Sequence, residues 1–242
     1  MKMKKSLLTM LALLSMGSSA FAQGTVNVPT VKRTAGDVKE VSVVASRQGK
    51  VKIELQNNAD YRDLQFDITL PEGITLADET NGGSVAIETD HAVGFATQTT
   101  AGVVRFVLYS ETGAKLSNNI LLEIPVKAAQ SFSGTQAATL TNVITSNDAA
   151  ETSIAIAQGD FNFRAVVLGD VTDDGNVDMA DAQAMVSFIF NNIPAIFVEE
   201  AGDVEENNLV DMADAQSLVS KIFAPSAKQF VKAVEDNELD PE

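Results

Sequence analysis

The chain has 242 residues, and its 33 acidic residues outnumber its 17 lysines and arginines, which gives a formal charge of −16. So acidic a surface repels nucleic acid and anionic lipid, and both are therefore poor partners for this protein. Cysteine is absent, which excludes disulfides, thiolate metal ligands and a cysteine nucleophile. A chain without disulfides must obtain its stability from an apolar core or from bound ions.

Residues 1–22 have the pattern of a secretory signal peptide. Three lysines near the start are followed by a short apolar run at residues 7–14 and by small residues at Ala20 and Ala22. The run is too short to span a bilayer, so we expect cleavage after Ala22 rather than membrane insertion. The mature chain is then periplasmic, held at the cell surface or secreted, and its charge falls to −19 because the three lysines are removed.

Residues 23–166 are predicted to form an all-β antiparallel sandwich. Apolar residues alternate with polar ones in many short runs, and turn sequences such as "LPEG" and "ETNGGS" separate the runs. Many short strands with one polar face favour a sandwich over a parallel sheet. The expected core positions are Val51, Ile53, Leu55, Leu64, Phe66, Ile68, Leu70, Val104, Phe106, Leu108, Ile120, Leu122, Ile124, Ile154, Ile156, Phe161 and Phe163.

The chain is predicted to be multidomain because a duplicated helical segment follows at 167–224. Gly169–Phe190 and Gly202–Phe223 are identical at 14 of 22 positions, and each ends in an apolar stripe with helical spacing. Each unit has only one stripe, so the two must pack together to form a core. An acidic tail, residues 225–242, completes the chain; its weak amphipathic stretch is expected to be a frayed helix before a solvated end. The stripe residues are Ala182, Met185, Val186, Ile189, Phe190, Ala215, Leu218, Val219, Ile222 and Phe223.

A run of oxygen-bearing side chains precedes each stripe with the spacing of a twelve-residue calcium loop. Calcium takes six to eight oxygen ligands, and such a loop supplies them from positions 1, 3, 5, 7, 9 and 12, the seventh through its backbone carbonyl. Position 6 makes a sharp bend, where Gly175 in the first loop and Asn208 in the second accept left-handed backbone geometry. The ligand positions are Asp170, Thr172, Asp174, Asn176, Asp178 and Asp181, and then Asp203, Glu205, Asn207, Leu209, Asp211 and Asp214.

The two loops differ in quality. The first keeps the glycine, whereas the second has the longer Glu205 at position 3 and an amide at position 5, so we expect the first calcium site to be the stronger. The alternative is that both are acidic turns whose last carboxylates, Asp181 and Asp214, only favour the positive ends of helices. Two loops with matching ligand positions favour calcium over this alternative.

The segments "GDVTDDGNVDMADAQAMVSFIF" and "GDVEENNLVDMADAQSLVSKIF" resemble the duplicated halves of a dockerin domain, the module that binds cohesins in bacterial cellulosomes. The resemblance covers residues 167–224 and implies two EF-hand-like calcium sites and a protein partner with a cohesin-like β-sandwich. In that family, loop positions 10 and 11 help to choose the partner; here they are Met179 and Ala180, then Met212 and Ala213. This sequence departs from the family at Thr172, Glu205 and Asn208.

The β half is similar to the cohesin-like and carbohydrate-binding-module-like sandwiches of exported Bacteroidetes proteins. The similarity lies in "IELQNNADYRDLQFDITLPEGI", "DHAVGF" and "VRFVLYS". It implies a jelly roll, and the partner could be this chain's own sandwich, that of another copy or that of a different protein.

These features favour an exported, non-catalytic, calcium-binding adhesion or assembly protein. The alternative is a carbohydrate-binding module of a polysaccharide-utilisation or cell-surface system, which would need exposed aromatic rings; tryptophan is absent and the two tyrosines are Tyr61 and Tyr109. An enzyme is the least favoured reading, because the single histidine, His91, has no accompanying nucleophile motif.

Overall fold

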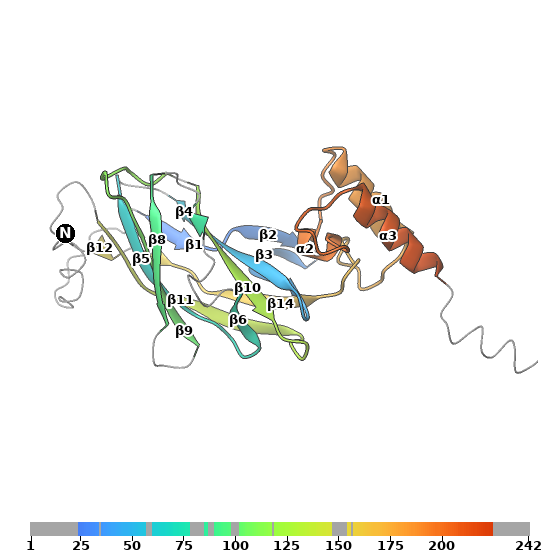
Figure 1. Cartoon of the computed structure of the whole chain (residues 1–242), viewed down its shortest axis with the longest axis horizontal. Helices are drawn as coiled ribbons and strands as arrows, with labels where there is room; N and C mark the ends of the chain where they lie inside the picture. The colour runs from blue at the N-terminus through green and yellow to red at the C-terminus, as the bar shows by residue number, and fades with distance from the viewer. Residues whose placement is uncertain are drawn as a thin grey trace, which may run out of the picture. The chain divides into compact units, whose positions relative to one another are not determined.

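A computed structural model describes residues 24–33, 35–56, 60–77, 85–86, 90–97, 102–117, 119–146, 154–155 and 157–224 (Figure 1). The predicted signal peptide and the acidic tail lie outside these residues. The chain divides into two compact units. Of the described residues, one unit contains those within 24–31 and 37–165, and the other contains those within 32–36 and 166–224. We call them the sandwich unit and the helical unit.

The smaller sheet of the sandwich unit has the order β13-β1-β4-β10-β6, with β7 paired to β10. Its centre is the antiparallel pair of β4 and β10. At its edge, β1 and β13 are parallel, so the expectation of a purely antiparallel fold is wrong there. The two strands come from opposite ends of the unit, and no hairpin therefore forces them to run in opposite directions. The strands are β1 (Thr25–Asn27), β4 (Gln48–Gln56), β6 (Ile74–Leu76), β7 (Val85–Ala86), β10 (Ile120–Ala128) and β13 (Ala157–Gln158).

The larger sheet has the order β2-β3-β14-β11-β5-β9-β8, with β12 paired to β11. The interior strand β5 is antiparallel to both of its neighbours, β9 and β11. The strands are β2 (Thr30–Arg33), β3 (Gly36–Val44), β5 (Asp63–Thr69), β8 (Ala92–Thr97), β9 (Val103–Tyr109), β11 (Thr135–Ser146), β12 (Ile154–Ala155) and β14 (Phe161–Val166).

Both sheets bury side chains in one shared core, which confirms the predicted sandwich architecture (Figure 1). The alternation predicted from sequence is visible in β5, where Leu64, Phe66 and Ile68 are at most 1% exposed. Phe66 stacks on Phe106 of β9 with ring centroids 5.4 Å apart. Leu70 is only partly buried because it lies just past the end of β5. The side chains predicted at Ile120, Ile154 and Ile156 lie outside the described ones.

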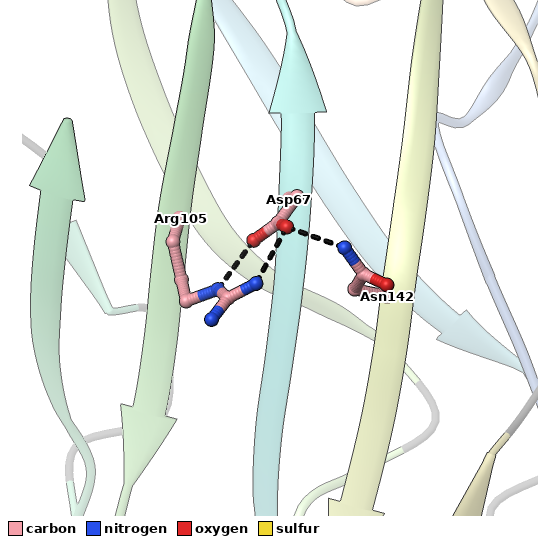
Figure 2. Close-up of polar contacts among 3 residues, drawn as sticks. All are labelled: Asp67, Arg105 and Asn142. Atoms are coloured by element: carbon pink, nitrogen blue, oxygen red, sulfur yellow. Dashed lines mark hydrogen bonds and ion pairs between the residues drawn. The ribbon is translucent and has the colours of Figure 1, made fainter. Parts of the chain in front are cut away.

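The opposite face of β5 carries a buried polar cluster, which Figure 2 shows. Asp67 points away from the core, yet it is only 1% exposed. Arg105, directly across on β9, binds both carboxylate oxygens, with Nε–Oδ1 at 2.6 Å and Nη2–Oδ2 at 2.7 Å. Asn142 of β11 donates to Oδ2 at 2.6 Å. The hydrogen bond to Asp67 raises the pKa of Arg105. The cluster therefore joins three neighbouring strands.

A bulge in β11 brings Asn142 to this cluster. The register between β11 and β5 shifts between Thr141 and Ile144, and Asn142 has a φ of 51°. Left-handed geometry is tolerated better by asparagine than by most residues. An extra residue in one strand also re-aims its side chains, which is how the amide reaches Asp67 from a neighbouring strand.

The helical unit contains α1 (Met179–Ile189), the short α2 (Glu199–Gly202) and α3 (Met212–Phe223). Its own apolar core contains residues of both predicted stripes and of the segments between them, among them Val171, Val198 and Ala201. The ring of Phe188, in α1, stacks on the ring of Phe197 with the ring centroids 4.2 Å apart. Among the residues that the structure describes, no helix has the length and hydropathy needed to cross a membrane.

The predicted stripes extend one residue too far at each C-terminal end. Phe190 is 74% exposed and Phe223 is 69% exposed, although both fit the helical spacing of a core position. Phe190 is the C-cap of α1 and Phe223 is the last residue of α3, so each stripe continues to the last turn, where the core no longer covers it. Helix α2 was not predicted, because its sequence "EEAG" has no periodicity of its own.

The cluster around Asp67 yields a stability prediction. Replacing Arg105 with Met leaves a carboxylate that is almost fully buried without its cation, and we expect the free energy of unfolding to fall by about 3–5 kcal/mol. The matched control is Lys115→Met, which removes an ion pair to Asp60 whose side chains are 47% and 70% exposed. That variant should lose at most about 1 kcal/mol. Urea denaturation measures both, and equal losses would contradict the prediction.

Candidate calcium loops and a groove between two helices

Each long helix begins at an aspartate that caps it. The Asp178 side chain accepts a hydrogen bond from the Ala180 backbone at 2.7 Å, and Asp211 does the same for Ala213 at 2.7 Å. Both helices have a capping box, in which the third helical residue accepts from the backbone of the cap residue. Helix α1 therefore begins at Met179, two residues before Asp181, the last position of the predicted calcium loop.

The first loop is closed by two aspartates, one at each end. Asp170 accepts backbone hydrogen bonds from Asp174 at 3.2 Å and from Gly175 at 3.0 Å. Asp181 accepts from both the backbone and the hydroxyl of Thr172, at 3.0 and 2.9 Å, and its other oxygen accepts from the backbone of Asp178 at 2.9 Å. The aspartates at positions 1 and 12 of the predicted ligand set thus accept hydrogen bonds from the loop backbone and hold the loop closed.

The second loop repeats this pattern with an offset of 33 residues. Asp203 accepts from the backbones of Asn207 and Asn208 at 3.0 and 2.9 Å. Asp214 accepts from the backbones of Glu205 and Asp211, both at 2.9 Å. Five backbone-to-carboxylate contacts, counting the helix cap, therefore recur at equivalent positions of the two loops.

The two loops differ at position 3. In the first loop the Thr172 hydroxyl donates to Asp181, so it lies beside the carboxylate at position 12. In the second, the Glu205 carboxylate accepts from the Ser217 hydroxyl of α3 at 2.6 Å. The Glu205 carboxylate is thus engaged by a side chain of α3, whereas the Thr172 hydroxyl of the first loop lies against Asp181. That the second calcium site is the weaker stays a prediction.

The backbone of both loops turns left-handed at the same two places. Position 6 has a φ of 86° at Gly175 and 66° at Asn208, as expected from the sharp bend of such loops. Position 4 is also left-handed, with a φ of 59° at Asp173 and 64° at Glu206. The sequence did not reveal this second turn, since neither residue type marks it.

Burial of charge is the dominant electrostatic feature of the loops. Asp181 and Asp214 are 0% exposed, and Asp170 is 6% exposed. Burial raises the pKa of Asp170, as do the charges of Asp181 and Asp174, whereas the backbone hydrogen bonds from Gly175 and Asp174 lower it. Residues 166–224 contain twelve acidic residues and a single lysine, Lys221, so this segment has almost no positive charge of its own with which to neutralise them.

The donor set fits a hard cation in chemistry. Among the described residues, no three Asp, Glu or His side chains converge closely enough to bind a metal ion by themselves. A calcium loop does not require this, because it also uses hydroxyl, amide and backbone oxygens. Leu209 at position 7 of the second loop is consistent with such a role, since its side chain is 64% exposed and only its carbonyl is needed. The first-loop residues that would hold an ion are Asp170, Thr172, Asp174, Asn176, Asp178 and Asp181.

Helices α1 and α3 lie side by side (Figure 1). Their side chains line an open groove of about 800 Å³. Five residues of α1 line it, and the other five lining residues are those found 33 positions later on α3. Two equivalent helices can turn the same face toward a shared groove only when they are related by an approximate twofold axis. The groove is therefore symmetric. The lining residues of α1 are Met179, Ala182, Gln183, Val186 and Ser187.

Two of the four predicted partner-binding residues line this groove. Met179 and Met212 are 39% and 42% exposed and stand at equivalent places on its wall. Ala180 and Ala213 follow them in the helices but do not line the groove. The groove itself was not predicted, because the apolar stripes were assigned to the core, although Val186 and Val219 on those stripes also face it.

The residues considered for the other functions take structural places. Tyr61, considered as a half-exposed ring for sugar stacking, is only 2% exposed, and burial raises its pKa. Tyr109, in β9, is of intermediate exposure. His91 is 9% exposed, and its Nε2 lies 2.9 Å from the Arg62 carbonyl oxygen. The buried Tyr61 ring cannot serve as a platform for a sugar.

No family model matches the sequence, and no curated protein matches it. The structure is similar to cohesin modules over about 60% of the chain. One is a cohesin module of a family 33 glycoside hydrolase from Clostridium perfringens, with 12% identity, a TM-score of 0.46 and coverage of 60% of this chain and 99% of that one. Another is a non-cellulosomal cohesin from the archaeon Archaeoglobus fulgidus, with 9% identity, a TM-score of 0.44 and coverage of 59% and 91%. A third is a chain of a type I cohesin–dockerin complex from Clostridium thermocellum, with 9% identity, a TM-score of 0.46 and coverage of 63% and 100%.

Proposed function

We propose that this chain is an exported, non-catalytic assembly protein whose helical unit binds two calcium ions and docks onto a protein partner through α1 and α3. The partner class is a cohesin-like β-sandwich, carried by this chain, by another copy or by a different protein. The sequence resemblance to dockerins suggests this class. The observation that carries the proposal is the complete burial of Asp181 and Asp214 in a segment with one lysine and twelve acidic residues.

Calcium acts structurally in this proposal. Buried carboxylates are costly unless they are compensated, and hydrogen bonds from backbone N–H groups compensate only part of the charge. A divalent cation in each loop supplies the rest, because it binds Asp170 and Asp181 in the first loop and Asp203 and Asp214 in the second. Since Asp178 and Asp211 both cap a helix and occupy position 9, the ion also stabilises the helix starts.

In this proposal, the ions fix the positions of the residues that contact the partner. Met179 and Met212 directly follow the two cap residues, so their positions depend on the loops. Methionine side chains are flexible and polarizable, which suits them to a contact surface. The symmetric groove presents the same set of side chains in either of two orientations, and a β-sheet face is broad enough to contact both helices at once.

Calcium should stabilise the helical unit of the chain from Gln23 onward. For an ion at one hundred times its dissociation constant, linkage gives about 2.7 kcal/mol per site. We expect EDTA to lower the helical circular dichroism signal and the melting temperature, and excess calcium to restore both. Asp181→Asn should remove the tighter of two binding steps in calorimetry, and Asp214→Asn the weaker.

The matched control for these variants is Asp173→Asn, which makes the same change of charge in the first loop. Asp173 is at position 4 of the loop, and this position supplies no ligand. It should keep both calcium-binding steps. Unchanged helicity in EDTA together with no heat of calcium binding would sink the proposal of calcium loops.

Docking should require the groove. If the partner sandwich is that of another copy, sedimentation velocity of the chain from Gln23 onward should show a calcium-dependent increase in mass. If it is a different protein, calcium-dependent capture from the envelope and secreted fractions of the source organism should show it. In either assay the double variant Met179→Glu with Met212→Glu should abolish binding, because it places two carboxylates in an apolar groove.

The control for docking is Ile193→Glu, which introduces the same charge at a residue that is 64% exposed and does not line the groove. It should bind as the unaltered chain does. Binding that survives the double methionine variant would show that the docking surface lies elsewhere.

A further inference from the structure

The groove between α1 and α3 has a specific candidate occupant in the chain itself. We propose that residues 226–234, "SAKQFVKAV", bind in this groove and cover it when no partner is present. We call them the tail segment. The proposed contact between the tail segment and the groove does not require a partner. Only its autoinhibitory role rests on the proposed docking function.

The way in which α3 ends makes the groove reachable. Ala224 has an extended backbone, with φ −64° and ψ 119°, because the following Pro225 disfavours helical geometry in the residue before it. Ser220, the last groove residue of α3, lies only four residues earlier. Residues 225–229 span at most about 17 Å, and the eleven residues of α1 are about 16 Å long. Phe230 can therefore reach any part of the groove.

The apolar side chains of the tail segment suit the lining of the groove. Phe230, Val231 and Val234 have the i, i+1, i+4 spacing of one helical face. The groove offers an exposed methionine on each wall, Met179 and Met212. Sulfur–aromatic contacts are favourable, and the twofold symmetry of the groove gives Phe230 an equivalent methionine on either side.

Charge distinguishes the tail segment from the other occupants. Residues 166–224 carry a formal charge of −11, from one lysine and twelve acidic residues, and two calcium ions would change this to −7. The tail segment carries two lysines, Lys228 and Lys232, and no acidic residue. Its charge is thus complementary to the surface around the groove. A second copy would instead bring another −11, which opposes direct pairing of two grooves.

The residues that follow the tail segment carry the same sign of charge as the surface around the groove. Residues 235–242 contain five acidic residues and no basic one. Like charge opposes binding of this acidic stretch to the acidic segment 166–224, whereas the tail segment combines apolar side chains with positive charge. A partner must displace it, and removal of the tail should therefore tighten partner binding.

Methionine NMR tests the contact directly. From Gln23 onward the chain has three methionines: Met179 and Met212 on the groove, and Met185, which is 0% exposed in the core. With ¹³C-methyl methionine and saturating calcium, truncation after Ala224 should shift the Met179 and Met212 signals and leave Met185 unchanged. Phe230→Ser should reproduce these shifts. Leu239→Ser, the same type of change in the acidic end, should not.

The outcomes are distinct from those of the docking experiments because no partner is used. Circular dichroism of the same samples verifies that α1 and α3 are formed, so unchanged Met179 and Met212 signals after truncation would overturn the inference. Shifts that vanish on dilution of the full chain would also overturn it, since the groove would then be covered by a second copy. Shifts independent of concentration, and lost in Phe230→Ser, support it.

Discussion

The helical unit depends on the burial of two carboxylates. Asp181 and Asp214 are inaccessible to water, and both oxygens of each accept hydrogen bonds from the loop that precedes the helix. They connect the start of each loop to the start of each helix, so the loop and the first helical turn form one structure. The segment from 166 to 224 supplies only Lys221 against twelve acidic residues, which is the reason that the proposed function places a cation in each loop.

Duplication converts this local arrangement into a domain. Each repeat has one helix whose apolar side cannot be buried by its own loop, and the shared core forms only when α1 and α3 meet. The repeated hydrogen bonds at the loops place both helices in equivalent ways, and the symmetric groove is the result. Phe190 and Phe223 are exposed although they continue the helical spacing of the stripes. At these positions the shared core has ended, so no apolar residues cover the two rings.

Patterns that repeat along the sequence predicted most of the fold, and contacts between distant residues were not predicted. Alternation located β5 and its neighbours, and the duplicated heptad located α1 and α3. The parallel pairing of β1 with β13 joins segments with no common local pattern. The bulge that carries Asn142 to Asp67 is set by the register of two strands, and no single strand sequence encodes it. Each loop could be recognised in the sequence because its predicted ligand positions all lie within twelve residues.

Both units bury carboxylates, and they differ in the positive charge that their own residues place beside them. In the sandwich unit, Asp67 has its cation within the fold, since Arg105 lies directly across on the next strand. In the helical unit, segment 166–224 supplies one lysine against twelve acidic residues, so under the proposed function an ion from solution provides the countercharge and folding depends on it. Met179, which lines the groove, directly follows the cap residue Asp178, so the loop and the groove are adjacent in the chain. Within the proposed function, this adjacency is how an ion in the loop would influence docking.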